Sequence, residues 1–350
     1  MSSVRIAIVG MGLIGRQHAS RVQSNPDSEL SAVVDATVDT VHLASQWRCP
    51  AYSNLDALLA TESVDAVIIA TPNPLHVEQA QQCLAAGMTV LIEKPLAESL
   101  ESAQSLVDWA NLNGCVNRCL VGHHRVHSAL LSKAIEVINE GHLGRLVAIQ
   151  GSALFAKPAQ YFVDSPWRTE PESGGPILIN LIHEIGNFRA LVGEIAEVSA
   201  LTSSETRGYE VEDSLSLAIR FKNGAMGSFL LSDCAASTQS WEQTSGENLS
   251  YFHDPVAPCY HIAGTQGSLT VPSLTLTTFG QGIEPSWWNT PNQQRLAHSK
   301  NDPLDAQLAH LIDLVRGNSA PRVSLNDGLA NMQVIEAISQ SIKTQRPCTL

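Results

Sequence analysis

The sequence predicts an α/β protein that begins with a doubly wound parallel sheet and continues into a second α/β domain. In the first third of the chain, short apolar runs rich in β-branched residues alternate with helical patterns, as in parallel sheets with helices on both faces. Later segments change to a period-two pattern around tight turns, which is typical of antiparallel strands. The 350 residues exceed what one hydrophobic core usually organises, so we expect two domains.

A glycine-rich turn follows the first predicted strand, residues 4–9, and precedes a helical pattern over 16–22. It consists of Gly10, Met11, Gly12, Leu13, Ile14 and Gly15. The first glycine of such a turn allows the tight bend, the second lets the backbone approach a pyrophosphate, and the third lets helix and strand pack closely. Phosphates bind to the free N–H groups of the helix N-terminus. We therefore predict a dinucleotide site; the alternative is a glycine-rich turn of an unrelated α/β domain.

Asp35 ends the second predicted strand, residues 30–34, and lies 20 positions after Gly15. A carboxylate there accepts hydrogen bonds from the adenosine ribose and repels a 2′-phosphate. Ala36 and Thr37 follow, so no neighbouring arginine is available to bind that phosphate. We predict NAD rather than NADP; the alternative is that Asp35 simply ends a strand.

Two further predicted strands, 64–70 and 89–92, end in polar turns. Ligands of open α/β sheets bind beyond the carboxyl ends of the strands. The expected cofactor contacts after these strands are Thr71, Pro72, Asn73, His76, Glu93 and Lys94. Lys94 can supply a cation for a developing alkoxide, or carry a proton if burial lowers its pKa. A strand-end lysine that points into water is the alternative.

A last strand over 119–122 closes the first domain, which we place at residues 1–123, with the second domain at 124–350. The second domain is expected to contain helices and strands at 128–139, 146–154, 214–221, 225–233, 260–264, 268–271, 305–316 and 325–344. Asn223-Gly224 predicts a hairpin. Polar composition predicts loops over 238–258 and 280–301.

A further helix begins at Pro176, after Gly174-Gly175, and is apolar around most of its circumference. Asn180, His183 and Asn187 form one polar stripe on it at helical spacing. We interpret this stripe as an edge that faces a site. The alternative for His183 is a core histidine bound to a backbone carbonyl.

Together, the glycine-rich turn, Ala70-Thr71-Pro72-Asn73 with His76, Glu93-Lys94-Pro95 and the Gly-Gly-Pro helix resemble the glucose–fructose oxidoreductase/inositol dehydrogenase (Gfo/Idh/MocA) family over almost the whole chain. The resemblance implies a Rossmann domain followed by an α/β domain with a large open, mostly antiparallel sheet. It implies that Lys94 and His183 take part in hydride transfer between nicotinamide and a CH–OH carbon, and that Arg125 contacts the substrate. It also implies a homodimer or homotetramer formed through the open sheet.

The chain departs from this family at two positions. Ile179 stands where many members have an aspartate four residues before the histidine, and Gly186 stands where an acid is common. The proton route then runs through Lys94 and water, or through the substrate. Asn180 is accordingly interpreted as a ligand of a substrate hydroxyl.

Other candidates have two open interpretations each. Trp167 and Arg168 either form an apolar wall and an anchor for a carboxylate or hydroxyl, or pack on their own domain. Glu93 is expected to hold its turn or a ribose hydroxyl, and the alternative is that it acts as a base. His123 and His124 either line the site or only end a strand.

Composition excludes several classes of function. The net charge of −13 disfavours nucleic acid, which needs a basic face. We see no signal peptide and no apolar run long enough to span a membrane, so we expect no membrane partner and a cytoplasmic location. The seven cysteines are scattered and are expected to be free thiols. The histidines lack metal-ligand spacing, so we expect no metal site.

The sequence thus predicts an NAD-dependent oxidoreductase acting on a secondary alcohol or ketone of a sugar, polyol or related cyclic hydroxyl compound; hydroxy acids also remain possible substrates. One alternative is a glycosidase or epimerase-like enzyme that retains NAD and cycles it through reduction and reoxidation. A second is a non-catalytic regulator that senses nicotinamide cofactors.

Overall fold

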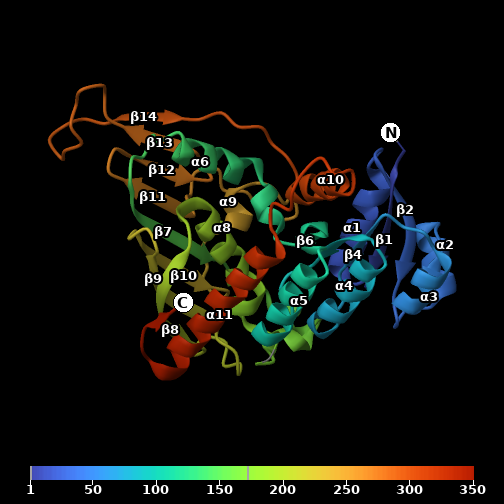
Figure 1. The fold of residues 1–350 in the computed structure, drawn as a ribbon. Coiled ribbons are helices and arrows are strands. Elements are labelled where there is room, and N and C mark those ends of the chain that lie inside the picture. Colours follow the sequence, from blue (N-terminus) through green and yellow to red (C-terminus); the bar gives the residue numbers. More distant parts are fainter. Residues whose placement is uncertain (1, 172) are drawn as a thin grey trace. The chain divides into compact units, whose positions relative to one another are not determined.

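The computed structural model describes residues 2–171 and 173–350 (Figure 1). The chain forms two compact units. The N-terminal unit comprises the described residues up to His127 together with Pro303–Met332. The C-terminal unit comprises Ser128–Asp302 and Gln333–Leu350.

The N-terminal unit contains a parallel sheet, the N-terminal sheet. In the described part of the chain its strand order is β3-β2-β1-β4-β5-β6, and neighbouring strands are parallel. The strands are β1 (Val4–Val9), β2 (Ser28–Val34), β3 (Ala51–Tyr52), β4 (Ala66–Ile69), β5 (Thr89–Ile92) and β6 (Cys119–Val121). Every residue of β4, β5 and β6 is buried, because helices cover both faces. The predicted doubly wound sheet is confirmed.

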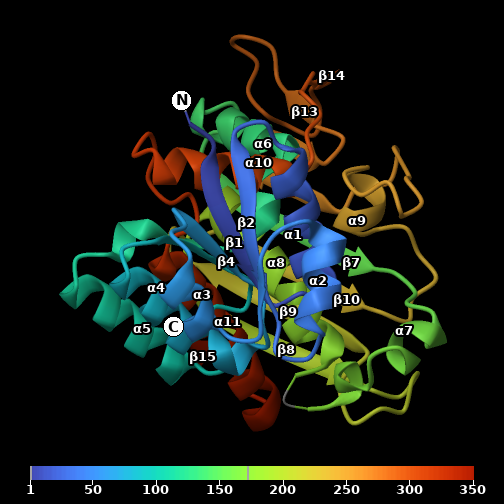
Figure 2. The ribbon, with the colours of Figure 1, turned by 90° about the vertical axis from the view of Figure 1, so that its right-hand side faces the viewer.

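The helices of this unit are α1 (Leu13–Ser24), α2 (Thr40–Trp47), α3 (Leu55–Thr61), α4 (His76–Ala85) and α5 (Leu100–Leu112), with short 3₁₀ turns η1 (Asn73–Leu75), η2 (Val116–Arg118) and η3 (His124–His127). Figure 2 shows α1 and α2 on one side of β1, β2 and β4, and α4 and α5 on the other. Asp39, Asn54 and Ser99 begin α2, α3 and α5 by accepting backbone N–H groups, as N-cap residues do. The N-cap predicted at Asn54 is confirmed.

A late segment of the chain packs onto this unit. It contains α10 (Pro303–Val315) and the start of α11 (Leu325–Thr344). Arg21 pairs with Asp305 at 3.1 Å, and the N–H of Val121 donates to the carbonyl of Val323 at 2.9 Å. A Cβ on Gly328 would lie 3.0 Å from Val121, so glycine lets α11 start against β6. The packing therefore groups 303–332 with the N-terminal unit, and the predicted boundary after residue 123 stays a prediction.

The C-terminal unit contains a second sheet, the C-terminal sheet. Within the described residues its order is β14-β13-β12-β11-β7-β10-β9-β8-β15. The strands are β7 (Leu146–Leu154), β8 (Ile195–Ser203), β9 (Ser214–Phe221), β10 (Met226–Ser232), β11 (Tyr260–Gly264), β12 (Gly267–Val271), β13 (Thr275–Thr278), β14 (Asn292–Arg295) and β15 (Cys348–Thr349). β7 and β10 pair in parallel and the other described neighbours pair antiparallel. The predicted large, mostly antiparallel sheet is confirmed.

Helices cover one face of the C-terminal sheet. They include α6 (Ala129–Asn139) and α8 (Ile182–Val192) (Figure 1). This unit also contains the shorter α7 (Ala159–Val163), α9 (Trp241–Thr244) and η4 (Pro166–Thr169). Phe188 of α8 packs edge-to-face on Phe229 of β10 with ring centroids 5.5 Å apart. A Cβ on Gly151 would lie 2.6 Å from the Phe188 ring, so glycine in β7 makes room for this contact.

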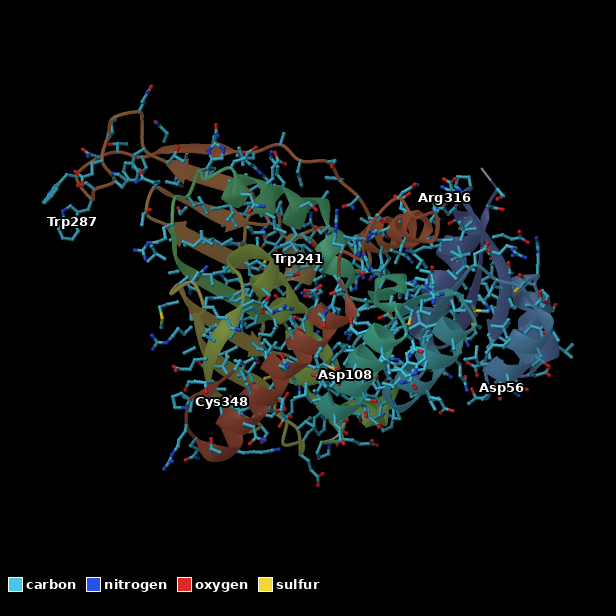
Figure 3. All side chains as sticks on the ribbon, viewed as in Figure 1. Asp56, Asp108, Trp241, Trp287, Arg316 and Cys348 are labelled. Atoms are coloured by element: carbon cyan, nitrogen blue, oxygen red, sulfur yellow. The ribbon has the colours of Figure 1, made fainter. Side chains whose placement is uncertain are left out.

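Two local expectations were wrong, because the segment 238–258 contains α9 and the segment 280–301 contains β14. The helix expected from Pro176 is present, and it opens with a π-helical turn, η5 (Ile177–Leu181), which was not predicted. All four residues of β14 are exposed, so this strand has no apolar alternation by which to recognise it. Trp287, within the β13–β14 loop, is 89% exposed, whereas Trp241 is buried (Figure 3).

Candidate active site

The glycine-rich turn joins β1 to α1, and each of its glycines has a different environment. Gly10 has φ +93°, and a Cβ there would lie 2.6 Å from the carbonyl oxygen of Ala70. A Cβ on Gly15 would lie 1.9 Å from the carbonyl oxygen of Gly10. At Gly12, by contrast, no atom of the described residues lies within 4 Å of a Cβ. The turn is therefore packed against the protein at two glycines and open at the third, which fits a pyrophosphate approaching Gly12.

Met11, Leu13 and Ile14 complete this turn. Met11 is buried, Leu13 is 75% exposed, and Ile14 is half-buried at the start of α1. No described side chain caps the N-terminus of α1. Its first N–H groups therefore remain available to an anion.

Asp35 at the end of β2 is fixed against the glycine-rich turn. Its Oδ2 accepts the N–H of Met11 at 2.8 Å, and its Oδ1 accepts the N–H and hydroxyl of Thr37 at 2.8 and 2.7 Å. Burial alone would raise the pKa of Asp35, but these hydrogen bonds outweigh burial and lower it. The side chain is thus a rigid anion beside the turn, as ribose binding in an NAD site requires.

The turns after β4 and β5 are connected by His76. Its Nδ1 lies 2.9 Å from the carbonyl oxygen of Pro95, and its Nε2 lies 2.9 Å from that of Thr71. Burial lowers the pKa of His76, and the two carbonyls oppose this. The hydroxyl of Thr71 donates to Gln79 at 2.7 Å. Both ring nitrogens of His76 therefore face backbone carbonyls of these turns, while Pro72 and Asn73 are more exposed.

Glu93 is buried and makes a hydrogen bond to a histidine that we did not predict. Its Oε1 lies 2.8 Å from Nε2 of His18, which is 2% exposed on α1. Burial would raise the pKa of Glu93, but the hydrogen bond and charge of His18 lower it. A Cβ on Gly122 would lie 2.9 Å from Glu93, so glycine is required beside it. The only sequence signal was a histidine on the apolar face of the first helix.

Lys94 follows Glu93 through a backbone N–H that lies 3.2 Å from Oε2 of Glu93, and its peptide bond to Pro95 is cis. Burial lowers the pKa of Lys94; the charge of Glu93 opposes this, and that of buried Arg125 adds to it. Burial also lowers the pKa of His124 to about 4. Lys94, His124 and Arg125 thus gather near the ends of β5 and β6. Nε2 of His123 lies 3.2 Å from Nδ2 of Asn331.

In the C-terminal unit, Glu212 fixes the start of the helix that carries the predicted residues. Its Oε1 accepts the N–H of Ile177, the first residue of η5, at 2.8 Å. Gly175 has φ +81°, and a Cβ there would lie 2.6 Å from the same oxygen. Burial raises the pKa of Glu212. π-helical turns occur often at functional sites, and this one contains Asn180.

The residues of the predicted polar stripe have different hydrogen-bond partners. Asn180 accepts a hydrogen bond from Nζ of Lys157 at 2.7 Å. Asn187 is fully buried and donates to the hydroxyl of Tyr260 at 2.8 Å, and this hydroxyl also donates to Glu184. His183 is 7% exposed. Asn187 is thus a core residue. Glu184, which follows His183 in the sequence, is hydrogen-bonded to Tyr260.

Trp167 and Arg168 lie on η4. Trp167 is 44% exposed. The Arg168 guanidinium stacks over the Tyr161 ring with Cζ 3.6 Å from its centroid and donates to the Tyr161 carbonyl. Arg168 therefore packs on its own unit, and a substrate contact by either residue stays a prediction.

Comparison with known proteins identifies the family. The model described as an oxidoreductase family with an NAD-binding Rossmann fold matches residues 4–123, and that for the C-terminal alpha/beta domain of the same family matches residues 135–350. The chain belongs to the Gfo/Idh/MocA oxidoreductase family. The resemblance inferred from the sequence is confirmed. The N-terminal unit of this Gfo/Idh/MocA protein is an NAD-binding Rossmann domain.

Individual Gfo/Idh/MocA relatives match over most of the chain. The 1,5-anhydro-D-fructose reductase of Ensifer adhaerens is 27% identical over 297 residues, covering 83% of this chain and 81% of that protein. The scyllo-inositol 2-dehydrogenase (NAD(+)) of Bacillus subtilis is 27% identical over 363 residues, covering 99% and 96%. The WlbA dehydrogenase from Bordetella pertussis, solved with NADH and UDP-GlcNAcA, has the same fold, with a TM-score of 0.78, 23% identity and 99% coverage of both chains.

Two further findings concern other partners. None of the described helices combines the length and apolar character needed to cross a membrane. Over residues 2–171 and 173–350, no group of three or more His, Cys, Asp or Glu side chains is arranged to hold a metal ion. The expectation of a metal-free site stays a prediction.

Proposed function

We propose that this protein is an NAD-dependent dehydrogenase that transfers hydride between nicotinamide and a secondary alcohol or ketone of a sugar, polyol or related cyclic hydroxyl compound. The observation that carries the proposal is Lys94, a lysine of lowered pKa at the end of β5 in an NAD-binding domain. The relatives from E. adhaerens and B. subtilis are named for an anhydro-sugar and an inositol, and they support this substrate class.

The proposed cofactor contacts are Gly10, Met11, Gly12, Leu13, Ile14, Gly15, Asp35, Thr71, Pro72, Asn73, His76, Glu93 and Lys94. The contact of His76 is indirect, because its ring nitrogens hold the turns that carry Thr71 and Pro95. The proposed substrate contacts are Arg125, Trp167, Arg168, Asn180 and His183.

Bound NAD supplies the hydride acceptor, and the protein must handle the hydroxyl proton and the charge that develops on oxygen. The proposed role of Lys94 is to hydrogen-bond this oxygen and to take up its proton, which a lowered pKa favours at neutral pH. The positive charge of buried Arg125 lies near Lys94 and lowers the proton affinity of the Lys94 amine. His183 is the proposed second group that binds the reacting hydroxyl.

Turnover tests the proposal. NADH formation with scyllo-inositol, and NADH oxidation with 1,5-anhydro-D-fructose, would be measured for the wild type, Lys94→Ala and Lys133→Ala. Loss of a general acid–base group lowers kcat by about 10²–10⁴-fold, so Lys94→Ala should lose turnover while NADH still raises its Tm. Lys133, which pairs with Glu136 on α6, provides the control. Normal turnover by Lys94→Ala contradicts the proposal, and substrate conversion without net NADH formation favours a cofactor-retaining enzyme.

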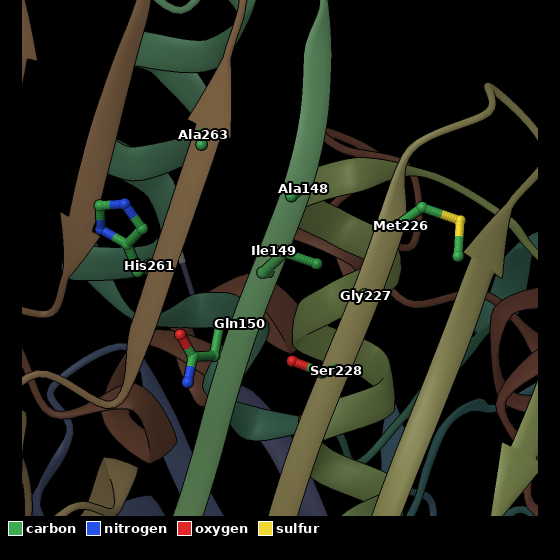
Figure 4. Close-up of a pocket in the computed structure, with 8 residues that line it drawn as sticks. All are labelled: Ala148, Ile149, Gln150, Met226, Gly227, Ser228, His261 and Ala263. Carbon is green, nitrogen blue, oxygen red and sulfur yellow. The ribbon is translucent and has the colours of Figure 1, made fainter. Parts of the chain in front are cut away.

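The proposal extends to assembly and location. The uncovered face of the C-terminal sheet has a shallow hollow of about 290 Å³ lined by β7, β10 and β11 (Figure 4). Met226 and Leu230 of β10 are 47% and 48% exposed on this face. Exposed apolar patches often mark interfaces, so we infer a homodimer or homotetramer formed through this face. A cytoplasmic location suits an enzyme that depends on a nicotinamide pool.

A further inference from the structure

Lys157 is a nearly buried lysine that the proposed reaction does not use. It lies between β7 and α7, and its side chain is 10% exposed. Its Nζ lies 2.7 Å from Oδ1 of Asn180 and 3.5 Å from Oδ2 of Asp233. An ammonium carries three N–H donors, and within the described residues these oxygens are its two polar partners. One donor therefore remains for a ligand.

Lys157 is buried among charges of both signs. Asp233 is already paired with Arg207, whose Nε lies 2.6 Å from Oδ1. A buried cation whose anionic partner is shared in this way costs free energy. Burial lowers the pKa of Lys157 to about 8; Asp233 and Glu242 oppose this, and Arg207 adds to it. Glu212 also interacts electrostatically with Lys157. The Tyr161 ring, 4.9 Å away, covers one side of the ammonium.

Lys157 also fixes the orientation of the Asn180 side chain. Because an ammonium only donates hydrogen bonds, the amide oxygen of Asn180 must face Lys157. Nδ2 of Asn180, with two N–H donors, then faces away, and it has no hydrogen-bond partner among the described residues. The backbone of Asn180 is held by η5, whose first N–H binds Glu212. Lys157 and Asn180 thus form a rigid pair with unused donors on neighbouring atoms.

We propose that Lys157 and Asn180 form a subsite for one acceptor oxygen, a hydroxyl of a polyhydroxy ligand, and that Lys157 determines specificity for that hydroxyl. This inference rests on the proposed function for its ligand class. A site built to hydrogen-bond a hydroxyl strongly rejects an analogue that lacks it, because buried polar groups are then left unpaired. The ligand must therefore carry oxygen at this position, and deoxy analogues should bind poorly.

Binding of scyllo-inositol and of a deoxy-inositol to the NADH-loaded protein tests the subsite by calorimetry, which requires no turnover. The variants are Lys157→Met, Lys157→Arg and, as a surface control, Lys133→Met. Loss of a hydrogen bond from a charged donor should weaken scyllo-inositol binding by about 10- to 100-fold in Lys157→Met. Deoxy-inositol should then bind this variant as tightly as scyllo-inositol does. NADH affinity and Tm show whether the variants are folded.

The pH dependence provides a second readout. In the wild type, raising the pH through about 8 removes the Lys157 proton, so scyllo-inositol affinity should fall. Arginine stays protonated, so Lys157→Arg should abolish this fall. Unchanged affinity, selectivity and pH dependence in Lys157→Met overturn the subsite, even if the wild type turns over substrate. Weakened binding in Lys157→Met with no wild-type turnover keeps the subsite and contradicts the proposed function.

Discussion

Gly12 and Gly15 share one turn but respond differently to an added methyl group. A Cβ on Gly15 would lie 1.9 Å from a backbone oxygen, whereas a Cβ on Gly12 meets no atom of the described residues within 4 Å. The clash at Gly15 is with the protein itself. At Gly12 the space is free for a ligand, and a methyl group there would compete with the cofactor.

Alanine at each position should separate folding from binding. Gly15→Ala should lower the free energy of unfolding by about 3 kcal/mol, a large single-residue effect. Gly12→Ala should keep wild-type stability but bind NADH at least about tenfold more weakly, a loss of about 1.4 kcal/mol. Denaturant unfolding and NADH titration measure the two quantities. Wild-type NADH affinity in Gly12→Ala would contradict pyrophosphate binding at this turn.

Residues whose partners lie nearby in sequence or follow a strand end could be predicted. Asp35 is an example, because the strand and the glycine-rich turn define its place. His18 and Lys157 could not be predicted, because Glu93 lies 75 positions from His18 and Asp233 lies far beyond Lys157 in the chain. Only tertiary packing brings these side chains together, so the spacing of residues along the sequence does not predict the contacts.

At the scale of elements, the helix that carries Asn180 and His183 depends on Glu212. This carboxylate accepts the N–H of Ile177 at 2.8 Å, one of the N–H groups that a helix start leaves without an intrahelical partner. Glutamine keeps an acceptor oxygen there, whereas alanine removes it. The matched pair Glu212→Gln and Glu212→Ala therefore isolates the hydrogen bond.

Glu212→Ala should lower the free energy of unfolding by about 1–3 kcal/mol, the cost of an unsatisfied buried donor. Glu212→Gln should lose less than half of that amount. Denaturant unfolding monitored by circular dichroism checks both values. Equal stability of the two variants would mean that water replaces the carboxylate at the N–H of Ile177.

Elements with one buried and one exposed face were predicted best. β9 alternates strictly between buried and exposed residues over most of its length, and its predicted bounds, 214–221, match. β14 is exposed throughout and was missed. The π-helical turn at Ile177–Leu181 was also missed, because its residues have the same apolar pattern as a buried α-helix.

At the scale of the whole molecule, the sequence predicts two domains but not which segments of the chain belong to each. The residues 303–332 join the N-terminal unit through contacts such as Arg316 with Asp27 at 3.0 Å. The partner of an amphipathic helix is any apolar surface of suitable shape. The pattern of α10 therefore predicts a buried face without indicating which unit covers it.

Assembly is the remaining property at this scale. On the uncovered face of the C-terminal sheet, Met226 lines the hollow together with Gln150 and His261 (Figure 4). Met226 and Leu230 of β10 are 47% and 48% exposed. Helices shield the opposite face. An apolar sheet face with this exposure is stabilised when a second copy covers it, and a buried charge without a partner would oppose that contact.

Met226→Glu combined with Leu230→Glu should therefore shift the protein from oligomer to monomer. Val41→Glu is the matched control, because Val41 is 74% exposed on α2, outside the proposed interface. Light scattering coupled to size-exclusion chromatography gives the mass, and NADH binding shows that the monomer retains its cofactor site. An oligomer that persists in the double variant means that another surface joins the subunits. A monomeric wild-type protein would contradict the proposed oligomer, because this face would then be exposed in solution.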